Sequence, residues 1–262
     1  MKFVYVIVGS EDNFFLEQSL ISIYTLRKHN PHAYISLLID DGTAKLITKY
    51  KSPILSYTNE ILTPTLPNGL LPIQKSRFLK TSQRKLLRGK LLYIDNDTFI
   101  TGSLKELEDL DYDIAAVANK HGYYDKLGSH PMNKHYQKVT GISPEKDLKI
   151  RNFVNNGVIF SSDTDLALDF FDMWHYLWWK TSSEKGFHKD QIEIWHTNVI
   201  KGNILKKLND NYNCQLVYPK ECLPYLPTAK IFHYFSSTDH ISHLTLKNKL
   251  FLYEEQGEMG FK

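Results

Sequence analysis

The feature that most constrains the fold of this chain is a short apolar run that stops abruptly on two acidic residues. Residues 90–94 read Lys-Leu-Leu-Tyr-Ile, and Asp95, Asn96 and Asp97 follow directly. A run of this length, closed by residues that favour turns, is typical of a strand buried in the centre of a sheet. Ligands of open α/β sheets bind at the carboxyl ends of such strands. The sequence therefore predicts an α/β fold with a binding site where this strand ends.

Two carboxylates at this spacing indicate what such a site can bind. If the strand geometry continues, Asp95 and Asp97 point the same way. Like charges this close raise each other's pKa unless a cation lies between them, and a divalent metal ion with oxygen ligands is the simplest such cation. An Asx-rich turn explains the same residues, because Asp and Asn side chains hydrogen-bond to nearby backbone groups. Residues 95–97 alone leave both interpretations open.

The N-terminal half has the pattern of a parallel α/β unit. Residues 3–8 are continuously apolar, residues 14–26 keep a helical period, and residues 34–39 form a second apolar run. A strand, a crossover helix and a second strand form a right-handed parallel unit. We therefore expect a Rossmann-like α/β domain. A single glycine, Gly9, follows the first strand, so neither the dinucleotide fingerprint nor the P-loop is present.

A basic helix leads into the acidic strand. Residues 76–87 carry apolar side chains at helical spacing, and Gly89 ends the pattern. The basic residues in and just after this helix are Arg77, Lys80, Arg84, Lys85 and Arg88. We expect these side chains to form a solvated face rather than an anion-binding surface.

Two later segments are irregular in sequence. Residues 119–151 contain many Gly, Pro and Tyr residues, and connections this long are usually functional or mobile, so we expect a lid or an acceptor-binding segment. Residues 154–160 have the composition of a strand, but Asn155, Asn156 and Gly157 interrupt it. A glycine inside a strand usually marks a bulge or a close approach of another group to the backbone.

The composition is that of a globular protein without a nucleic-acid partner. The 262 residues are 42% hydrophobic, which is enough for a substantial core. Lys and Arg number 32 against 29 acidic residues, so the net charge of +3 gives no electrostatic case for nucleic-acid binding. The first apolar run is too short for a secretory signal or a membrane span, so we expect a cytoplasmic protein and leave peripheral membrane contact open. Cys214 and Cys222 lack metal-site spacing and are expected to be reduced thiols.

Four segments occur in an order that is typical of one enzyme family. They are residues 6–14 (Val-Ile-Val-Gly-Ser-Glu-Asp-Asn-Phe), residues 76–78 followed by residues 92–100 (Ser-Arg-Phe, then Leu-Tyr-Ile-Asp-Asn-Asp-Thr-Phe-Ile), residues 153–160 (Phe-Val-Asn-Asn-Gly-Val-Ile-Phe), and the pair Asp190 and Gln191. Together they resemble glycosyltransferase family 8, the retaining, nucleotide-sugar-dependent enzymes of the lipopolysaccharide galactosyltransferase and glycogenin type. The resemblance implies one GT-A domain over residues 1–262, with a mostly parallel, mixed sheet flanked by helices. Residues 1–118 would be its nucleotide-binding half and residues 119–262 its acceptor and lid half.

The resemblance implies a metal site. Asp95 and Asp97 would bind a divalent ion, Mn²⁺ or alternatively Mg²⁺, that bridges the phosphates of a UDP-sugar and acts as a Lewis acid. His233 would be the third protein ligand, because the family places a metal-binding histidine on a late strand. An imidazole beside carboxylates favours Mn²⁺ over Ca²⁺. A histidine on an apolar strand is often only a hydrogen-bonded core residue, and this alternative stays open for His233.

The resemblance also implies which residues hold the donor. They would be Gly9, Glu11, Asn13, Arg77, Asp95, Asn96, Asn155, Asn156 and Asp190, with Asp190 and Gln191 as the catalytic pair. Glu11 and Asn13 would contact the uracil and ribose, and Asp190 with one of the two asparagines would bind the sugar hydroxyls. Glutamine is a poor nucleophile, so Gln191 would stabilise the oxocarbenium-like state on the β face of the sugar. The donor would be a UDP-hexose, glucose or galactose, and the acceptor a saccharide or lipid-linked glycan.

One segment departs from the family pattern and keeps two other functions open. The family follows its metal-binding histidine with Gly and then Lys-Pro-Trp, which places an ammonium on the distal phosphate, whereas residues 234–240 read Tyr-Phe-Ser-Ser-Thr-Asp-His. His240, Lys247 or Lys249 would have to substitute for that lysine, so a non-catalytic homologue that binds a sugar nucleotide or glycan is one alternative. A phosphatase of the haloacid dehalogenase type is the other, because it also places two aspartates after a buried strand.

Overall fold

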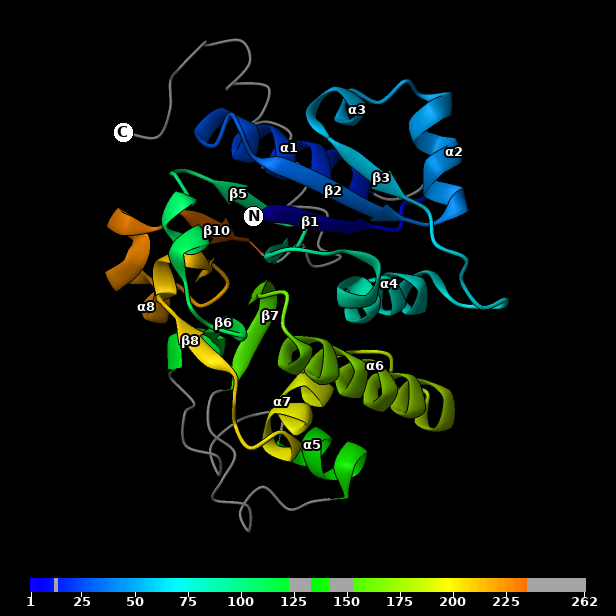
Figure 1. The fold of residues 1–262 in the computed structure, drawn as a ribbon, viewed down its shortest axis with the longest axis vertical. Helices are drawn as coiled ribbons and strands as arrows, with labels where there is room; N and C mark the ends of the chain where they lie inside the picture. Colours follow the sequence, from blue (N-terminus) through cyan, green and yellow to red (C-terminus); the bar gives the residue numbers. More distant parts are fainter. Residues whose placement is uncertain (12–13, 123–132, 142–152, 235–262) are drawn as a thin grey trace.

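The structure is a computed structural model that describes residues 1–11, 14–122, 133–141 and 153–234. Its centre is a seven-stranded sheet in the order β3-β2-β1-β4-β7-β6-β8 (Figure 1). The strands are β1 (Lys2–Ile7), β2 (Tyr34–Ile39), β3 (Glu60–Leu62), β4 (Leu91–Ile94), β6 (Ile114–Ala118), β7 (Val154–Ser161) and β8 (Lys206–Leu208). β7 is antiparallel to β4 and β6, and the other neighbouring pairs are parallel. The predicted α/β fold with a mostly parallel, mixed sheet is therefore confirmed.

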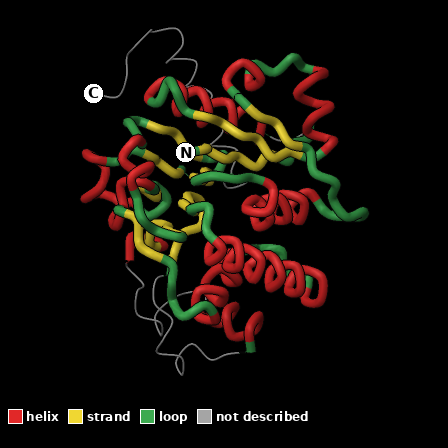
Figure 2. The backbone as a smooth tube through the Cα atoms, viewed as in Figure 1, coloured by secondary structure: helices red, strands yellow, loops and turns green. Residues whose placement is uncertain are grey.

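Helices cover both faces of this sheet (Figure 2). The odd-numbered residues of β1 pack in one core cluster with α1 (Phe15–His29), α2 (Asp41–Lys49) and α3 (Ile54–Tyr57). The even-numbered residues pack in the other, with α4 (Pro72–Leu86), α5 (Asn133–Thr140), α6 (Asp165–Lys185) and α7 (Gln191–Ile200). Strand side chains alternate between the two faces of a sheet. A strand that is apolar at every position, as predicted for residues 3–8, is thus buried on both sides.

A second, three-stranded sheet joins distant parts of the chain. It has the order β5-β10-β9, formed by β5 (Thr98–Ile100), β10 (Ile231–His233) and β9 (Cys214–Gln215). β10 is antiparallel to β5 and parallel to β9. Because β5 begins directly after Asp97 and pairs with β10, this small sheet brings the end of β10 to the end of β4.

The structure tests several expectations for individual segments. The irregularity predicted in β7 is confirmed, because its register with β6 shifts between Ala116 and Ala118. Cys214 and Cys222 are buried free thiols, as expected. Of the expected lid, residues 119–122 and 133–141 are described, and the rest lies outside the described residues.

Short elements complete the chain. They are η1 (Lys105–Asp109), η2 (Asn119–Gly122), η4 (Asp210–Tyr212), α8 (Pro219–Cys222) and η5 (Leu223–Thr228). None of the helices in the described ranges combines the length and the apolar character that a membrane crossing requires.

Candidate metal and donor site

The structure brings together the three residues predicted to hold a metal ion. Asp95, Asp97 and His233 each offer one ligand atom, and these atoms lie within 4.8 Å of one another. His233 Nε2 is 3.1 Å from Asp97 Oδ1. His233 is 2% exposed, so it is buried as a core histidine would be, but its Nε2 atom faces a carboxylate.

The backbone explains why residues so far apart in sequence meet here. The register of the antiparallel pair β5 and β10 places His233 opposite Thr98, one residue after Asp97. The Tyr234 amide donates to the Asp97 carbonyl at 3.0 Å, and the Asp95 amide donates to the Gly157 carbonyl at 2.7 Å. The two aspartates are thus fixed by β10 on one side and by β7 on the other.

Gly157 leaves the space in which the imidazole of His233 lies. A Cβ atom at Gly157 would be 2.8 Å from His233 Nδ1 and 2.9 Å from Asn155 Oδ1, closer than real Cβ contacts. The close approach predicted at this glycine is therefore confirmed, and the approaching group is the histidine ring.

The donor set fits a divalent cation. Two carboxylates and one imidazole suit ions such as Mn²⁺ or Zn²⁺ better than Ca²⁺ or Mg²⁺, which take mainly oxygen ligands. The 3.1 Å between His233 Nε2 and Asp97 Oδ1 is short enough for both atoms to bind one ion.

A buried lysine links the acidic site to the start of α7. Lys80 is 1% exposed, and its Nζ is 3.2 Å from Asp95 Oδ1 and 3.8 Å from Asp190 Oδ2. The same ammonium lies 4.6 Å from the ring centre of Tyr93, whose hydroxyl donates to Asp95 Oδ1. The solvated face expected for the basic residues of α4 is therefore wrong for Lys80, and also for Arg84, which is 1% exposed and pairs with Asp163.

Asp190 is the centre of a second cluster beside the first. It is buried, its Oδ1 is 3.1 Å from Arg77 Nε, and Asn156 Nδ2 donates to its Oδ2 at 2.9 Å. Burial alone would raise the pKa of Asp190, but the charges of Lys80 and Arg77 and the hydrogen bond from Asn156 outweigh it and hold the pKa below its usual value. Asp190 therefore stays an ionised hydrogen-bond acceptor.

Gln191 is the first residue of α7 and follows Asp190 directly. Its Nε2 donates to the Val154 carbonyl at 3.1 Å, and the Trp195 ring Nε1 donates to the same carbonyl at 2.9 Å. The predicted catalytic pair thus lies where α7 begins, and its two side chains are held by different partners.

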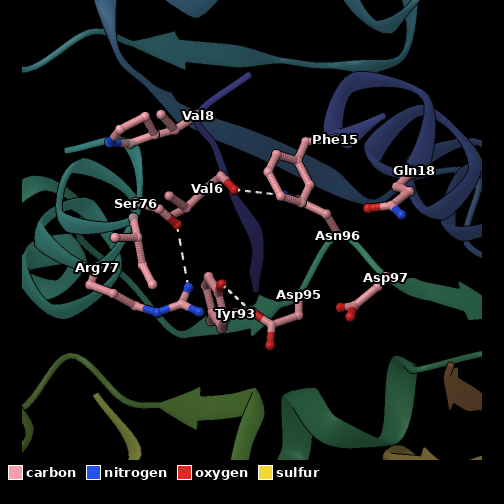
Figure 3. A pocket seen from close by; sticks show the side chains of 12 residues that line it. Val6, Val8, Phe15, Gln18, Ser76, Arg77, Tyr93, Asp95, Asn96 and Asp97 are labelled. Carbon is pink, nitrogen blue, oxygen red and sulfur yellow. Dashed lines mark hydrogen bonds between the residues drawn. The ribbon is translucent and has the colours of Figure 1, made fainter. Parts of the chain in front are cut away.

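A cavity of about 420 Å³ opens beside the acidic residues (Figure 3). Its polar part includes Arg77, Asp95, Asn96 and Asp97, and its apolar part includes Phe15, from α1. The full lining consists of Val6, Val8, Phe15, Gln18, Pro72, Ile73, Ser76, Arg77, Tyr93, Asp95, Asn96 and Asp97. Asn96 is anchored by a 2.9 Å hydrogen bond from its Nδ2 to the Val6 carbonyl. The predicted donor-binding residues of β4 and α4 therefore share one cavity.

The predicted contacts from the first loop lie elsewhere. The Gly9 amide donates to Thr43 Oγ1 at 2.8 Å, and Gly9 is not among the lining residues. Glu11 is exposed and accepts hydrogen bonds from Lys49 Nζ at 2.5 Å and from the Tyr50 hydroxyl at 3.0 Å. The hydrogen bonds from Lys49 and Tyr50 hold the pKa of Glu11 below its usual value. Asn13 lies outside the described residues, as do His240, Lys247 and Lys249.

Two further residues belong to the site. Lys80 follows Arg77 by three positions on a helix, so the spacing places both side chains on one face, and the structure shows that both reach Asp190. Asn213, whose Oδ1 is 3.1 Å from His233 Nδ1, lies in a short irregular segment before β9. No local pattern marks Asn213, because its role depends on the pairing of β9 with β10.

Comparison with known proteins supports the fold. No protein-family model matches the sequence, and no curated protein is similar to it in sequence. Mouse xyloside xylosyltransferase 1 has a similar structure, with a TM-score of 0.57 and 12% identity over 89% of this chain and 97% of that chain. The galactosyltransferase LgtC, solved with donor and acceptor sugar analogues, has a TM-score of 0.61 and 12% identity over 97% of this chain and 96% of its own.

A third solved structure covers a smaller share of its own chain. The glycosyltransferase GlyE of Streptococcus pneumoniae has a TM-score of 0.59 and 18% identity over 90% of this chain and 55% of that chain. All three similarities extend over most of the present chain. The chain therefore has the fold of GT-A glycosyltransferases.

Proposed function

We propose that the protein is a retaining, metal-dependent glycosyltransferase of the family 8 type, which moves a hexose from a UDP-sugar to a saccharide or lipid-linked glycan. The observation that carries the proposal is the convergence of Asp95, Asp97 and His233 at the carboxyl end of β4, in a chain with the GT-A fold. Both aspartates also line the cavity. Mn²⁺ is the ion that this donor set favours, with Mg²⁺ as the alternative.

The metal site and the cavity would bind different parts of the donor, the diphosphate and the base. When bound by the three residues, the ion would supply Lewis-acid chemistry and neutralise charge on the diphosphate leaving group. The apolar part of the cavity, which includes Phe15 and Ile73, offers a surface on which a flat base can stack. For Glu11 to contact the uracil, as the resemblance implies, its ion pair with Lys49 would have to open.

The cluster around Asp190 suits the donor sugar. An ionised Asp190 accepts hydrogen bonds from sugar hydroxyls, and Arg77 and Asn156 hold that carboxylate in place. Gln191, next to it, would use its amide oxygen to stabilise the positive charge that develops on the sugar ring. LgtC has been solved as an active-site mutant in which a glutamine is replaced by glutamate, which supports the placement of a glutamine in the active site.

A donor screen tests the proposal. The protein is incubated with UDP-glucose or UDP-galactose, Mn²⁺ and a panel of saccharide acceptors, and release of UDP is measured together with the anomeric configuration of the product. We expect slow donor hydrolysis without acceptor, transfer with retained configuration, and loss of both in Asp97→Asn. Asp169→Asn, which removes an exposed carboxylate paired with Lys201, is the matched control and should stay active.

The same screen separates the alternatives. Mn²⁺-dependent binding of UDP without hydrolysis or transfer would identify a non-catalytic homologue. Release of phosphate from a sugar phosphate without any requirement for UDP would instead indicate the haloacid dehalogenase chemistry.

A further inference from the structure

A chain of three hydrogen bonds connects a backbone amide to the imidazole of His233. The Gly157 amide donates to Asn155 Oδ1 at 2.8 Å, and Asn213 Nδ2 donates to the same oxygen at 2.9 Å. Asn213 Oδ1 is in turn 3.1 Å from His233 Nδ1. The four residues are buried or lie inside a buried strand, with Asn213 fully buried.

The backbone amide fixes the direction of every bond in this chain. A backbone N–H can only donate, so the Asn155 atom that faces Gly157 must be its oxygen. That oxygen can only accept, so Asn213 must present its amide nitrogen to it and its own oxygen to His233. An amide oxygen cannot donate, so the proton at this end must be on His233 Nδ1.

We propose that Asn155 and Asn213 are positioning residues that hold His233 as the Nδ1-protonated tautomer, with the Nε2 lone pair directed at the metal site. The inference rests on the proposed function only in one respect, namely that the lone pair binds a metal ion. Asn155 thereby takes a role that differs from the donor-sugar contact implied by the resemblance, and Asn213 takes a role that the resemblance did not assign.

Nε2 of His233 lies 3.1 Å from Asp97 Oδ1. A doubly protonated ring would donate a hydrogen bond across this distance, whereas in the neutral, Nδ1-protonated ring two lone pairs face each other. Two acceptors at this distance repel each other unless a cation lies between them. A metal-binding histidine usually donates its other ring N–H to a neighbouring acceptor, which fixes the tautomer and ring orientation. Asn213 Oδ1 is such an acceptor.

Gly157 helps to position both His233 and Asp95. Its amide begins the chain that ends at His233, and its carbonyl accepts the hydrogen bond from the Asp95 amide. Its missing side chain also makes room for the imidazole. One peptide segment of β7 therefore sets the positions of two metal ligands that come from β4 and β10.

The first test measures the tautomer directly and requires neither metal nor activity. Histidine is labelled with ¹⁵N, and the two ring nitrogens of His233 are observed by NMR in metal-free protein at a pH where the ring is neutral. The His233→Gln variant assigns the signal. We expect the proton on Nδ1 in the wild type and a mixture of tautomers in Asn213→Leu. A proton on Nε2 in the wild type would overturn the proposal.

The second test measures Mn²⁺ affinity from the free-ion signal in electron paramagnetic resonance. Loss of the positioning contact in Asn213→Leu should weaken Mn²⁺ binding by roughly 10- to 100-fold, as losses of such supporting hydrogen bonds do. Asn155→Asp keeps an acceptor for both donors and should bind Mn²⁺ at least as tightly as the wild type. A folded Asn213→Leu variant with unchanged Mn²⁺ affinity would contradict the proposal.

A matched control separates positioning from general loss of stability. Asn198 is also buried, accepts from the Leu205 amide at 2.9 Å and donates to Asn203 Oδ1 at 3.3 Å. Asn198→Leu should lower the melting temperature but leave the His233 tautomer and Mn²⁺ affinity unchanged. If the wild type binds no metal, the proposed function fails, while the NMR experiment still decides the tautomer.

Discussion

Gly157 and His233 occupy adjoining space that no larger pair of side chains can share. A Cβ atom at residue 157 would lie 2.8 Å from the Nδ1 atom of the imidazole. β7 supplies the glycine and β10 supplies the histidine, so this contact joins the large sheet to the small one. The pairing of β5 with β10 brings residues 97 and 233 together, and the missing side chain at residue 157 leaves room for the imidazole.

We expect Gly157→Ala to displace the His233 ring. The displacement should cost about 1–3 kcal/mol of unfolding free energy, as overpacking of a filled core does, and should weaken Mn²⁺ binding. Chemical denaturation with and without Mn²⁺ measures both effects. Gly42→Ala is the control, because a Cβ at Gly42 makes only ordinary contact with Asp40, and it should not reduce Mn²⁺ affinity. Wild-type stability and Mn²⁺ affinity in Gly157→Ala would contradict the packing described for His233.

The ammonium of Lys80 neutralises two carboxylates that lie in or beside the buried interior. Lys80→Met leaves Asp95 and Asp190 without this partner, and the removal of one member of a buried ion pair costs about 3–5 kcal/mol. We expect the unfolding free energy of metal-free protein to fall by this amount, as measured by urea denaturation. Excess Mn²⁺ should restore part of it, because an ion that binds only the folded state stabilises it.

The control for Lys80 is another lysine of the same helix. Lys85 pairs with Asp172 at 3.1 Å, but both side chains are largely exposed. Lys85→Met should therefore lower the unfolding free energy by less than about 1 kcal/mol, as is usual for the loss of an exposed ion pair. Equal losses in the two variants would show that Lys80 has no special place in the charge balance of the site.

Glu193, in α7, makes the unfolding free energy of the protein depend on pH. Burial, together with the charge of Asp190, raises the pKa of Glu193 to about 8. The folded state therefore keeps a proton that the unfolded state releases near its ordinary pKa of 4.5. Stability should fall as pH rises between these two values, by up to about 1.4 kcal/mol per pH unit from this group alone.

Substitution of Glu193 tests this dependence of stability on pH. Glu193→Gln should be more stable than the wild type above pH 5, with a difference that grows until about pH 8. Thermal denaturation across this range measures the difference. Glu184→Gln, at an exposed position of α6, should follow the wild type at every pH. A constant difference between Glu193→Gln and the wild type would rule out the buried proton.

Gln191 should affect the rate and not the affinity for the nucleotide. Its proposed contribution is the dipole of its amide oxygen beside the positive charge that develops on the sugar ring, and loss of one preorganised polar group of this kind costs about 10²–10³ in kcat. We expect Gln191→Ala to lower kcat for donor hydrolysis by this order while the Kd for UDP stays unchanged. Unchanged turnover would remove Gln191 from the catalytic machinery.

Much of the fold was predictable because its signals are local. Residues 3–8 and 34–39 are apolar on both faces, and this pattern correctly indicated parallel strands covered on both sides. The run that ends at Asp95 correctly indicated the central strand β4. The strand β9 has no such local signal, because it is only two residues long and is defined by its pairing with β10.

The charges of the site were harder to predict than its position. The two carboxylates stand together in sequence, but Lys80 looked like a surface lysine because α4 alone does not show what covers it. Its partners come from β4 and from α7, 15 and 110 positions further along the chain. Asn213 depends in the same way on the packing of β9, β10 and β7. Such long-range contacts are set by topology and leave no periodic trace in the sequence.

The most direct test of the central claim is calorimetric titration of UDP into the protein with Mn²⁺ and, separately, with a chelator. We expect UDP to bind much more tightly in the presence of Mn²⁺, and Asp97→Asn to remove this difference, because an ion held by Asp95, Asp97 and His233 would neutralise charge on the diphosphate. Equal affinity for UDP with and without Mn²⁺ in the wild type would contradict the account.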